Sequence, residues 1–239
     1  MTEETSPRRV MAVFAHPDDA PFIVGGTLAL WGRQGDIITL VVATSGDKGS
    51  NDPDITPNEL TALRESEERC AAAVLGISEV IFLHHKDGEL TPSLELRGEI
   101  TRLIRLKKPD IVVTFDPTVF WTGTISLNHP DHRAIGVATL EAVYPTARDR
   151  LNFPEHLTAE GLETHKARTI YIAATNDPTH AVDITSSIDQ KIAALREHKS
   201  QIADMDAMAL RMRDRALDPK SPPDQPRYIE QFRVIQLWR

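Results

Sequence analysis

The chain has 239 residues, 41% of them hydrophobic and 26% charged, a balance typical of a globular protein that excludes disordered and fibrous classes. The 27 basic and 35 acidic residues give a formal net charge of −8, which argues against nucleic acid or an anionic membrane surface as a partner. No apolar run approaches the roughly 18 to 20 residues of a membrane span, and the N-terminus is unlike a secretory or transit signal, so we expect a cytoplasmic protein.

The first half of the chain alternates short apolar runs with amphipathic segments. Continuous apolar runs are typical of strands that are covered on both faces of a sheet. Strands are expected at residues 10–15, 37–43, 80–83 and 111–115. Helices are expected at residues 27–34, 57–75 and 94–107, the second between Pro57 and Gly76. This alternation predicts an α/β fold with a mostly parallel sheet.

The second half is less regular. A helix is expected after Asp131 in "HRAIGVATLEAVY", a strand at 169–174, a helix capped by Ser186 or Ser187, and a last strand in "FRVIQLW". Residues 205–226 lose periodicity and become proline-rich, which predicts an irregular excursion. We find no linker that would divide the chain, so a single domain over residues 1–239 is expected. The one cysteine, Cys70, cannot form an internal disulfide and is expected to be buried on its helix.

Titratable side chains follow the first predicted strand directly, in the segment "HPDD" at residues 16–19. Ligands of open parallel sheets bind at the carboxyl ends of the strands, so these groups lie where a site is expected. The glycine-rich phosphate loop of a nucleotide-binding fold is absent at that point. A second segment, "HPDH" at residues 129–132, follows the strand at 111–115.

Together the two segments offer the ligands of a catalytic metal site. Each segment alone is an ordinary turn or helix start, but two of them at strand ends of one sheet favour a shared site. A catalytic zinc usually takes three protein ligands and keeps one position open. His16, Asp19 and His132 would supply two nitrogens and one oxygen, and Asp18 would stay free to act as a base.

Three ordered motifs, "AHPDD", "ATSGDKGS" and "HPDH", make the chain resemble the LmbE-like or PIG-L family of zinc-dependent N-acetylglucosaminyl deacetylases. The likeness extends over most of residues 10–200. It implies a Rossmann-like, three-layer α/β/α fold and hydrolysis of an N-acetyl group from an amino sugar conjugate.

The resemblance also implies roles for individual residues. His16, Asp19 and His132 would hold the metal, and Asp18 would be the general base that deprotonates the metal-activated water. His129 would be the second acid/base group, which polarises the carbonyl or protonates the leaving amine. Asp131 would orient or tune one of the histidines.

Substrate contacts are expected from three further residues. Arg64 lies early in the second helix, in an R-x-x-E arrangement with Glu67, and the alternative is a solvated helix face. Asp87 precedes Gly88 in a turn and would accept hydrogen bonds from sugar hydroxyls, unless it is a plain turn residue. Asp47 belongs to the small-residue loop "TSGDKGS", which otherwise is a flexible turn.

Several alternatives stay open at the level of sequence. The same chemistry could act on a non-sugar amide, such as an antibiotic or thiol conjugate, or the metal could serve a non-catalytic binding protein. One divalent ion per chain is expected, with zinc favoured and iron or manganese compatible with the ligands. A homo-oligomer is compatible with an exposed Leu237 or Trp238 at the C-terminus.

Overall fold

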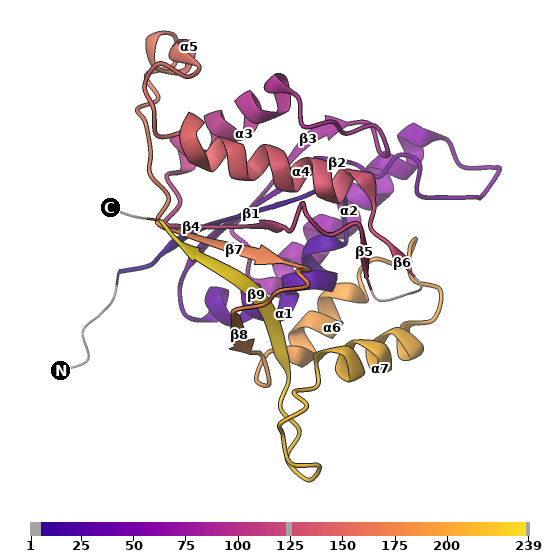
Figure 1. The fold of residues 1–239 in the computed structure, drawn as a ribbon. Helices are drawn as coiled ribbons and strands as arrows, with labels where there is room; N and C mark the ends of the chain where they lie inside the picture. Colours follow the sequence, from indigo (N-terminus) through magenta and orange to yellow (C-terminus); the bar gives the residue numbers. More distant parts are fainter. Residues whose placement is uncertain (1–5, 123–125, 238–239) are drawn as a thin grey trace.

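The computed structural model of the protein describes residues 6–122 and 126–237. A seven-stranded sheet forms its centre, in the order β3-β2-β1-β4-β7-β9-β8 (Figure 1). Neighbouring strands from β3 to β7 pair parallel, whereas β9 pairs antiparallel with both β7 and β8. The strands of this sheet are β1 (Arg9–Phe14), β2 (Ile37–Thr44), β3 (Glu79–His85), β4 (Ile111–Phe115), β7 (Thr169–Ala173), β8 (His180–Asp183) and β9 (Ile229–Gln236). A separate antiparallel pair is formed by β5 (Trp121–Thr122) and β6 (Ser126–Leu127).

Helices cover both faces of the sheet (Figure 1). Helices α1, α2 and α6 pack against one another on one face, and α3 and α4 pack together on the other. The helices are α1 (Asp19–Arg33), α2 (Pro57–Leu75), α3 (Leu94–Lys107), α4 (Pro130–Glu141), the π-helical segment η1 (Ala142–Thr146), α5 (Pro154–Thr158), α6 (Ile188–Leu195) and α7 (Met205–Ala216). The prediction of a three-layer α/β/α fold with a mostly parallel sheet is therefore confirmed.

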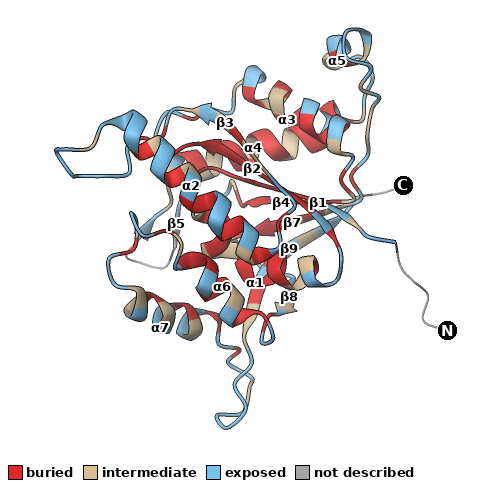
Figure 2. Ribbon diagram, turned by 180° about the vertical axis from the view of Figure 1, so that it is seen from behind, coloured by how far each residue is buried: buried red, intermediate tan, exposed pale blue. Residues whose placement is uncertain are grey.

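Strand β1 is the most deeply buried part of the sheet. It lies between β2 and β4, and its residues from Val10 to Phe14 are at most 2% exposed. Figure 2 shows the central strands buried between the two helical layers. Because β1 and β4 run parallel, the segments that follow them meet at one edge of the sheet.

Helix α1 begins eight residues earlier than the sequence predicted, at Asp19 instead of Thr27. The pair Gly25-Gly26 is not a break before the helix but lies inside it. A Cβ on Gly26 would stand 2.6 Å from Ile184 Cδ1, so glycine is needed for close packing rather than for a turn. The early start places the first turn of α1 directly at the end of β1.

The prediction of an irregular segment over 205–226 is wrong for its first half. Residues 205–216 form α7, whose N-cap Asp204 accepts hydrogen bonds from the N–H groups of Asp206 and Ala207. Every fourth residue of α7 is buried, which is the stripe of a helix that packs on one side. The buried residues are Met208, Met212 and Ala216. Three arginines lie between these buried residues, so the apolar period was hard to recognise in the sequence.

Two other sequence expectations need correction or qualification. Cys70 is exposed rather than buried, because it lies on the outer side of α2. The expected cap Ser187 does precede α6, but its hydroxyl donates to Gly26 O at 2.7 Å instead of capping the helix. Trp238 lies outside the described residues. No described helix has the length and apolar character needed to cross a membrane.

Candidate active site

The two titratable segments meet in one pocket at the carboxyl edge of the sheet. Residues 16–19 join β1 to α1, and residues 129–132 form the first turn of α4 and its cap. The pocket has a volume of about 260 Å³. It is lined by His16, Asp18, Asp19, Arg64, Asp87, His129 and His132.

Asp19 contacts both histidines of the predicted metal set. Its Oδ1 lies 3.1 Å from His132 Nε2, and its Oδ2 lies 3.5 Å from His16 Nδ1. Oδ2 also accepts hydrogen bonds from the N–H groups of Ala15 (3.2 Å) and His16 (2.8 Å). Burial opposes ionisation of this carboxyl, but His132 and His16 outweigh it and lower its pKa. Asp19 is thus held as an anion in a fixed position.

His16 is surrounded by carboxylates. Its Nε2 lies 3.1 Å from both Asp87 Oδ1 and Asp131 Oδ2, while its Nδ1 faces Asp19. Burial would lower the pKa of His16, but hydrogen bonds to Asp131, Asp19 and Asp87 raise it to about 12. A site that favours a positive charge so strongly suits a divalent cation.

Two groups of side chains in the described part of the chain bring their ligand atoms within 4.8 Å of one another, as a metal requires. These groups are His16, His129 and His132, and His16, Asp87, His129 and Asp131. Asp19 belongs to neither group, although it touches two of their histidines. The donor set of imidazole nitrogens and carboxylate oxygens fits zinc and related divalent metals.

His132 is held on two sides. Its Nδ1 lies 2.9 Å from Asn128 Oδ1, and its ring stacks on that of Phe115 at a centroid distance of 4.1 Å. The other nitrogen, Nε2, is thereby directed at Asp19. Metal-binding histidines usually donate their second nitrogen to such a partner. We did not predict Asn128, although it directly precedes the "HPDH" segment.

Asp131 contacts His16 more closely than its neighbour His129 in the motif, at 3.1 Å against 3.9 Å. Its side chain is fully buried, and it accepts hydrogen bonds from the N–H groups of Gly88 (2.7 Å) and Leu90 (3.2 Å). His129 caps α4, with its Nδ1 accepting from the Asp131 N–H at 3.2 Å. Asp131 therefore ties the loop after β3 to the first turn of α4.

Asp18 lies in the pocket beside Asp19, with Arg64 Nη2 at 3.3 Å from its Oδ2. Burial and the neighbouring Asp19 raise the pKa of Asp18 to about 7, against the opposing effect of Arg64. A carboxyl with such a pKa can exchange a proton at neutral pH.

Arg64 is not on a solvated helix face, because its side chain is buried. It lines the pocket and donates to Gly46 O at 3.1 Å. A Cβ on Gly46 or Gly49 would stand 2.1 Å or 2.4 Å from Arg64 Nη1, so both glycines make room for the guanidinium. Glu67 points elsewhere and accepts hydrogen bonds from Ser200.

Of the two aspartates expected to bind substrate, only Asp87 lines the pocket. Its hydrogen bond to His16 lowers its pKa. Asp47 is buried behind it, and its Oδ1 accepts from the Asp87 N–H at 2.9 Å. Asp47 thus supports Asp87 instead of facing the pocket.

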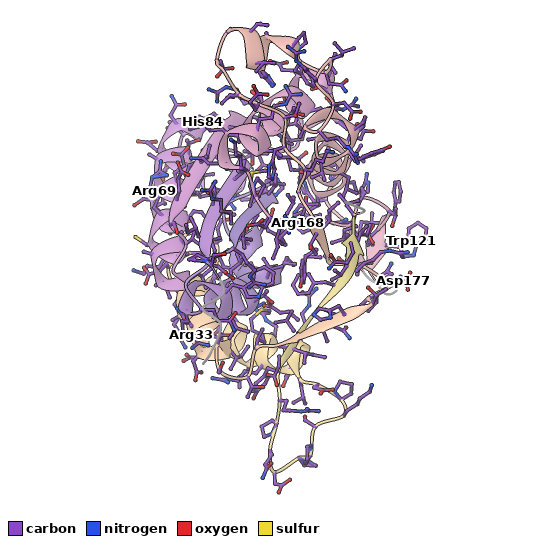
Figure 3. All side chains as sticks on the ribbon, turned by 90° about the vertical axis from the view of Figure 1, so that its left-hand side faces the viewer. Arg33, Arg69, His84, Trp121, Arg168 and Asp177 are labelled. Carbon is purple, nitrogen blue, oxygen red and sulfur yellow. The ribbon has the colours of Figure 1, made fainter. Side chains whose placement is uncertain are left out.

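His84 and His85, at the end of β3, do not join the site. His84 contacts Glu65 at 3.1 Å, and His85 contacts Glu99 at 2.6 Å. Figure 3 shows His84 at the outer surface, on the opposite side of the molecule from Trp121. Neither histidine belongs to the two groups of possible metal ligands found among the described residues.

Glu68, near the site, was missed in the sequence, and His198 lies beside it. Glu68 accepts a hydrogen bond from the Asp18 N–H at 2.6 Å, and His198 Nε2 lies 3.6 Å from Glu68 Oε2. Both side chains are completely buried. The one signal for Glu68 is its spacing of four residues from Arg64, which places both on one face of α2.

Comparisons with known proteins point to one family. The model of the family described as PIG-L, GlcNAc-PI de-N-acetylase, matches residues 11–143. A diacetylchitobiose deacetylase of Thermococcus kodakarensis is 31% identical over 194 residues, which cover 81% of this chain and 70% of that protein. A probable N-acetyl-alpha-D-glucosaminyl L-malate deacetylase 2 of Bacillus anthracis is 30% identical over 203 residues, 82% of either chain.

A comparison with solved structures also finds a deacetylase. The structure of an N,N'-diacetylchitobiose deacetylase from Pyrococcus horikoshii, complexed with an inhibitor, matches with a TM-score of 0.86 and 30% identity. The match covers 97% of this chain and 85% of that one. The matched family region includes both segments that form the pocket. The chain therefore belongs to the PIG-L family of GlcNAc-PI de-N-acetylases and their deacetylase relatives.

Proposed function

We propose that this protein is a metal-dependent deacetylase that hydrolyses the N-acetyl group of an N-acetylglucosamine-type conjugate. The observation that carries the proposal is the position of Asp18, whose carboxyl lines the pocket beside the cluster of His16 and Asp19. The raised pKa of Asp18 suits a base that works near neutral pH. The deacetylase relatives support the class of substrate.

His16, Asp19 and His132 would hold one metal ion, most simply zinc, although iron or manganese would also suit two nitrogens and one oxygen. When bound, the metal supplies a Lewis acid that activates water and polarises the acetyl carbonyl. The hydrogen bond of Asn128 to His132 and the contacts of Asp131 with His16 would keep both imidazoles in place.

Proton transfer would fall to Asp18 and His129. Asp18 would take a proton from the attacking water and later release it towards the leaving amine. Burial and the charge of His16 lower the pKa of His129, so its imidazole is neutral at pH 7. Because its Nδ1 accepts a hydrogen bond from the Asp131 N–H, its proton is on Nε2, which can donate to the acetyl oxygen.

Substrate recognition is proposed for the rim of the same pocket. Arg64 and Asp87 line it and could bind sugar hydroxyls, with Asp47 acting through its hydrogen bond to the backbone of Asp87. We further propose that residues 1–239 act as one domain, because the sheet takes its strands from Arg9 to Gln236.

The test is metal analysis followed by an acetate-release assay. The purified chain is expected to contain one divalent ion and to release acetate from diacetylchitobiose or N-acetylglucosaminyl malate. Chelator should abolish the release, and added zinc should restore it. A chain that binds metal but releases no acid from any amide would instead be a binding protein. Release only from a thiol or antibiotic conjugate would keep the chemistry but change the substrate.

A further inference from the structure

Two side chains of α2 hold the peptide bond between Pro17 and Asp18 from opposite sides. Arg64 Nη2 donates to the Pro17 carbonyl oxygen at 2.7 Å. Glu68 Oε2 accepts from the Asp18 N–H at 2.6 Å. Arg64 and Glu68 are four residues apart and so lie on one face of the helix. A single helix turn thereby fixes both polar groups of this peptide.

The backbone that they hold is strained. Asp18 has φ 95° and ψ −23°, in the left-handed region that residues other than glycine rarely adopt. Such a conformation costs free energy and persists only where surrounding contacts determine it. The Asp18 carbonyl is also bound, by the Phe22 N–H at 3.0 Å, as α1 begins. In this conformation the Asp18 side chain lies in the pocket, next to Arg64.

The hydrogen bond to Asp18 is the main polar contact of Glu68. Its side chain is 0% exposed, and within the described residues its single hydrogen bond is to Asp18. Burial raises the pKa of Glu68 to about 8, so the neutral acid predominates at pH 7. The buried ring of His198 lies behind it, 3.6 Å from Oε2. A buried carboxyl is costly to keep, which favours a specific task.

We propose that Glu68 is a positioning residue for Asp18: its hydrogen bond keeps the Asp18 backbone left-handed and so directs the carboxyl of the base into the pocket. Glu68 does not line the pocket itself and acts only through Asp18. The catalytic part of this inference rests on the proposed function, in which Asp18 is the general base.

Three variants separate positioning from general stability. Glu68→Met keeps the length of the side chain but offers no strong acceptor to the Asp18 N–H. Glu68→Gln keeps a neutral carbonyl oxygen in the same place. Leu75→Ala removes a buried side chain from the far end of the same helix, so it weakens α2 without touching Asp18.

The experiment has two readouts, one of which needs no activity. Hydrogen exchange of the Asp18 amide should become at least about tenfold faster in Glu68→Met, because its acceptor is gone. In an acetate-release assay, kcat should fall by about 10- to 100-fold with KM within about twofold, since a small displacement of a catalytic group lowers turnover. Metal content should match the wild type, Glu68→Gln should restore both readouts, and Leu75→Ala should lower only the melting temperature.

Two outcomes count against the inference. Unchanged exchange of the Asp18 amide in Glu68→Met would show that Glu68 does not hold this backbone. Equal effects in Leu75→Ala would mean a general loss of helix stability. If Glu68→Met does not fold, Glu68→Ala is measured in the same way. A wild type without deacetylase activity would contradict the proposed function alone, because the exchange measurement still decides whether Glu68 holds Asp18.

Discussion

The two ends of the sheet are built differently and serve different purposes. From β1 to α4, strands and helices alternate and all strand pairs of the central sheet are parallel. The described residues that line the pocket all lie in this part, between His16 and His132. From β7 onwards the order changes, with β9 inserted antiparallel between β7 and β8. Among its described residues, that second part contributes none to the lining of the pocket.

The second part of the chain holds α1 through hydrogen bonds from β9 and from the start of α6. Glu230 on β9 accepts hydrogen bonds from the N–H groups of Gly26 and Thr27, and its partner Lys191 lies 2.6 Å away. The hydroxyl of Ser187 binds the Gly26 carbonyl. The regular parallel half therefore contains the pocket, whereas the antiparallel half holds in place the helix that begins with Asp19.

The largest effect is expected in the parallel half, from Asp18→Asn. The amide cannot accept the proton, so kcat should fall by about 10²- to 10⁴-fold, the usual contribution of a general base. Metal content should be unchanged, because Asp18 is not a proposed ligand. Steady-state kinetics and metal analysis check this, and undiminished turnover would remove Asp18 from its role.

In the antiparallel half, Glu230→Ala should act on stability instead. It leaves the buried ammonium of Lys191 and two backbone N–H groups without their partner, at a cost of about 3–5 kcal/mol in unfolding free energy. Urea denaturation measures this loss. The control Glu230→Gln keeps an acceptor and should lose less. If kcat of folded Glu230→Ala fell as much as that of Asp18→Asn, the antiparallel half would also be needed for turnover. That result would contradict the proposed difference between the two halves.

Asn128→Ala should have an intermediate effect, on metal affinity. It removes the partner of His132 Nδ1, so the imidazole is free to turn away from Asp19. Loss of such a partner typically costs about 10- to 100-fold in metal affinity or activity. Competition with a chelator measures the affinity, and Asn128→Asp, which keeps the acceptor oxygen, should retain most of it. Equal affinity in Asn128→Ala would show that His132 does not need this contact.

The smallest effect is expected from the protonation of His198. This residue belongs to the antiparallel half, and its ring lies 3.6 Å from Glu68 of α2. Burial lowers the pKa of His198 to about 4, below its ordinary value of 6.5. The unfolded chain therefore binds this proton more readily than the folded one. The stability that the neutral ring provides is complete above pH 6.5 and is lost as the pH falls from 6.5 to 4.

His198→Phe keeps a ring that cannot be protonated, so its stability should decline less between pH 6.5 and 4 than that of the wild type. The difference is expected to be on the order of 1–3 kcal/mol, read from urea denaturation at several pH values. Parallel curves for the two proteins would mean that His198 is protonated equally in both states.

The local signals of the sequence predicted the order of strands and helices in the parallel half, although not the first turns of α1. Buried strands, the ends of α2 at Pro57 and Gly76, and the "HPDD" and "HPDH" segments are each set by residues close together in the chain. The rule that sites lie at the carboxyl ends of parallel strands then joined the two segments across more than a hundred residues. The π-helical segment η1 and the helix α7 were missed, because neither shows a long apolar period.

From the sequence alone, we could therefore determine the α/β architecture and the side chains that make up the pocket. Only the tertiary structure decided how they are held: Glu68 binds Asp18 across 50 residues, and Glu230 binds Gly26 across 204. Asp131 likewise contacts His16 across 115 residues. Such contacts depend on which buried polar groups come together when the layers pack. They cannot be predicted from a pattern of residues that are close together in the sequence.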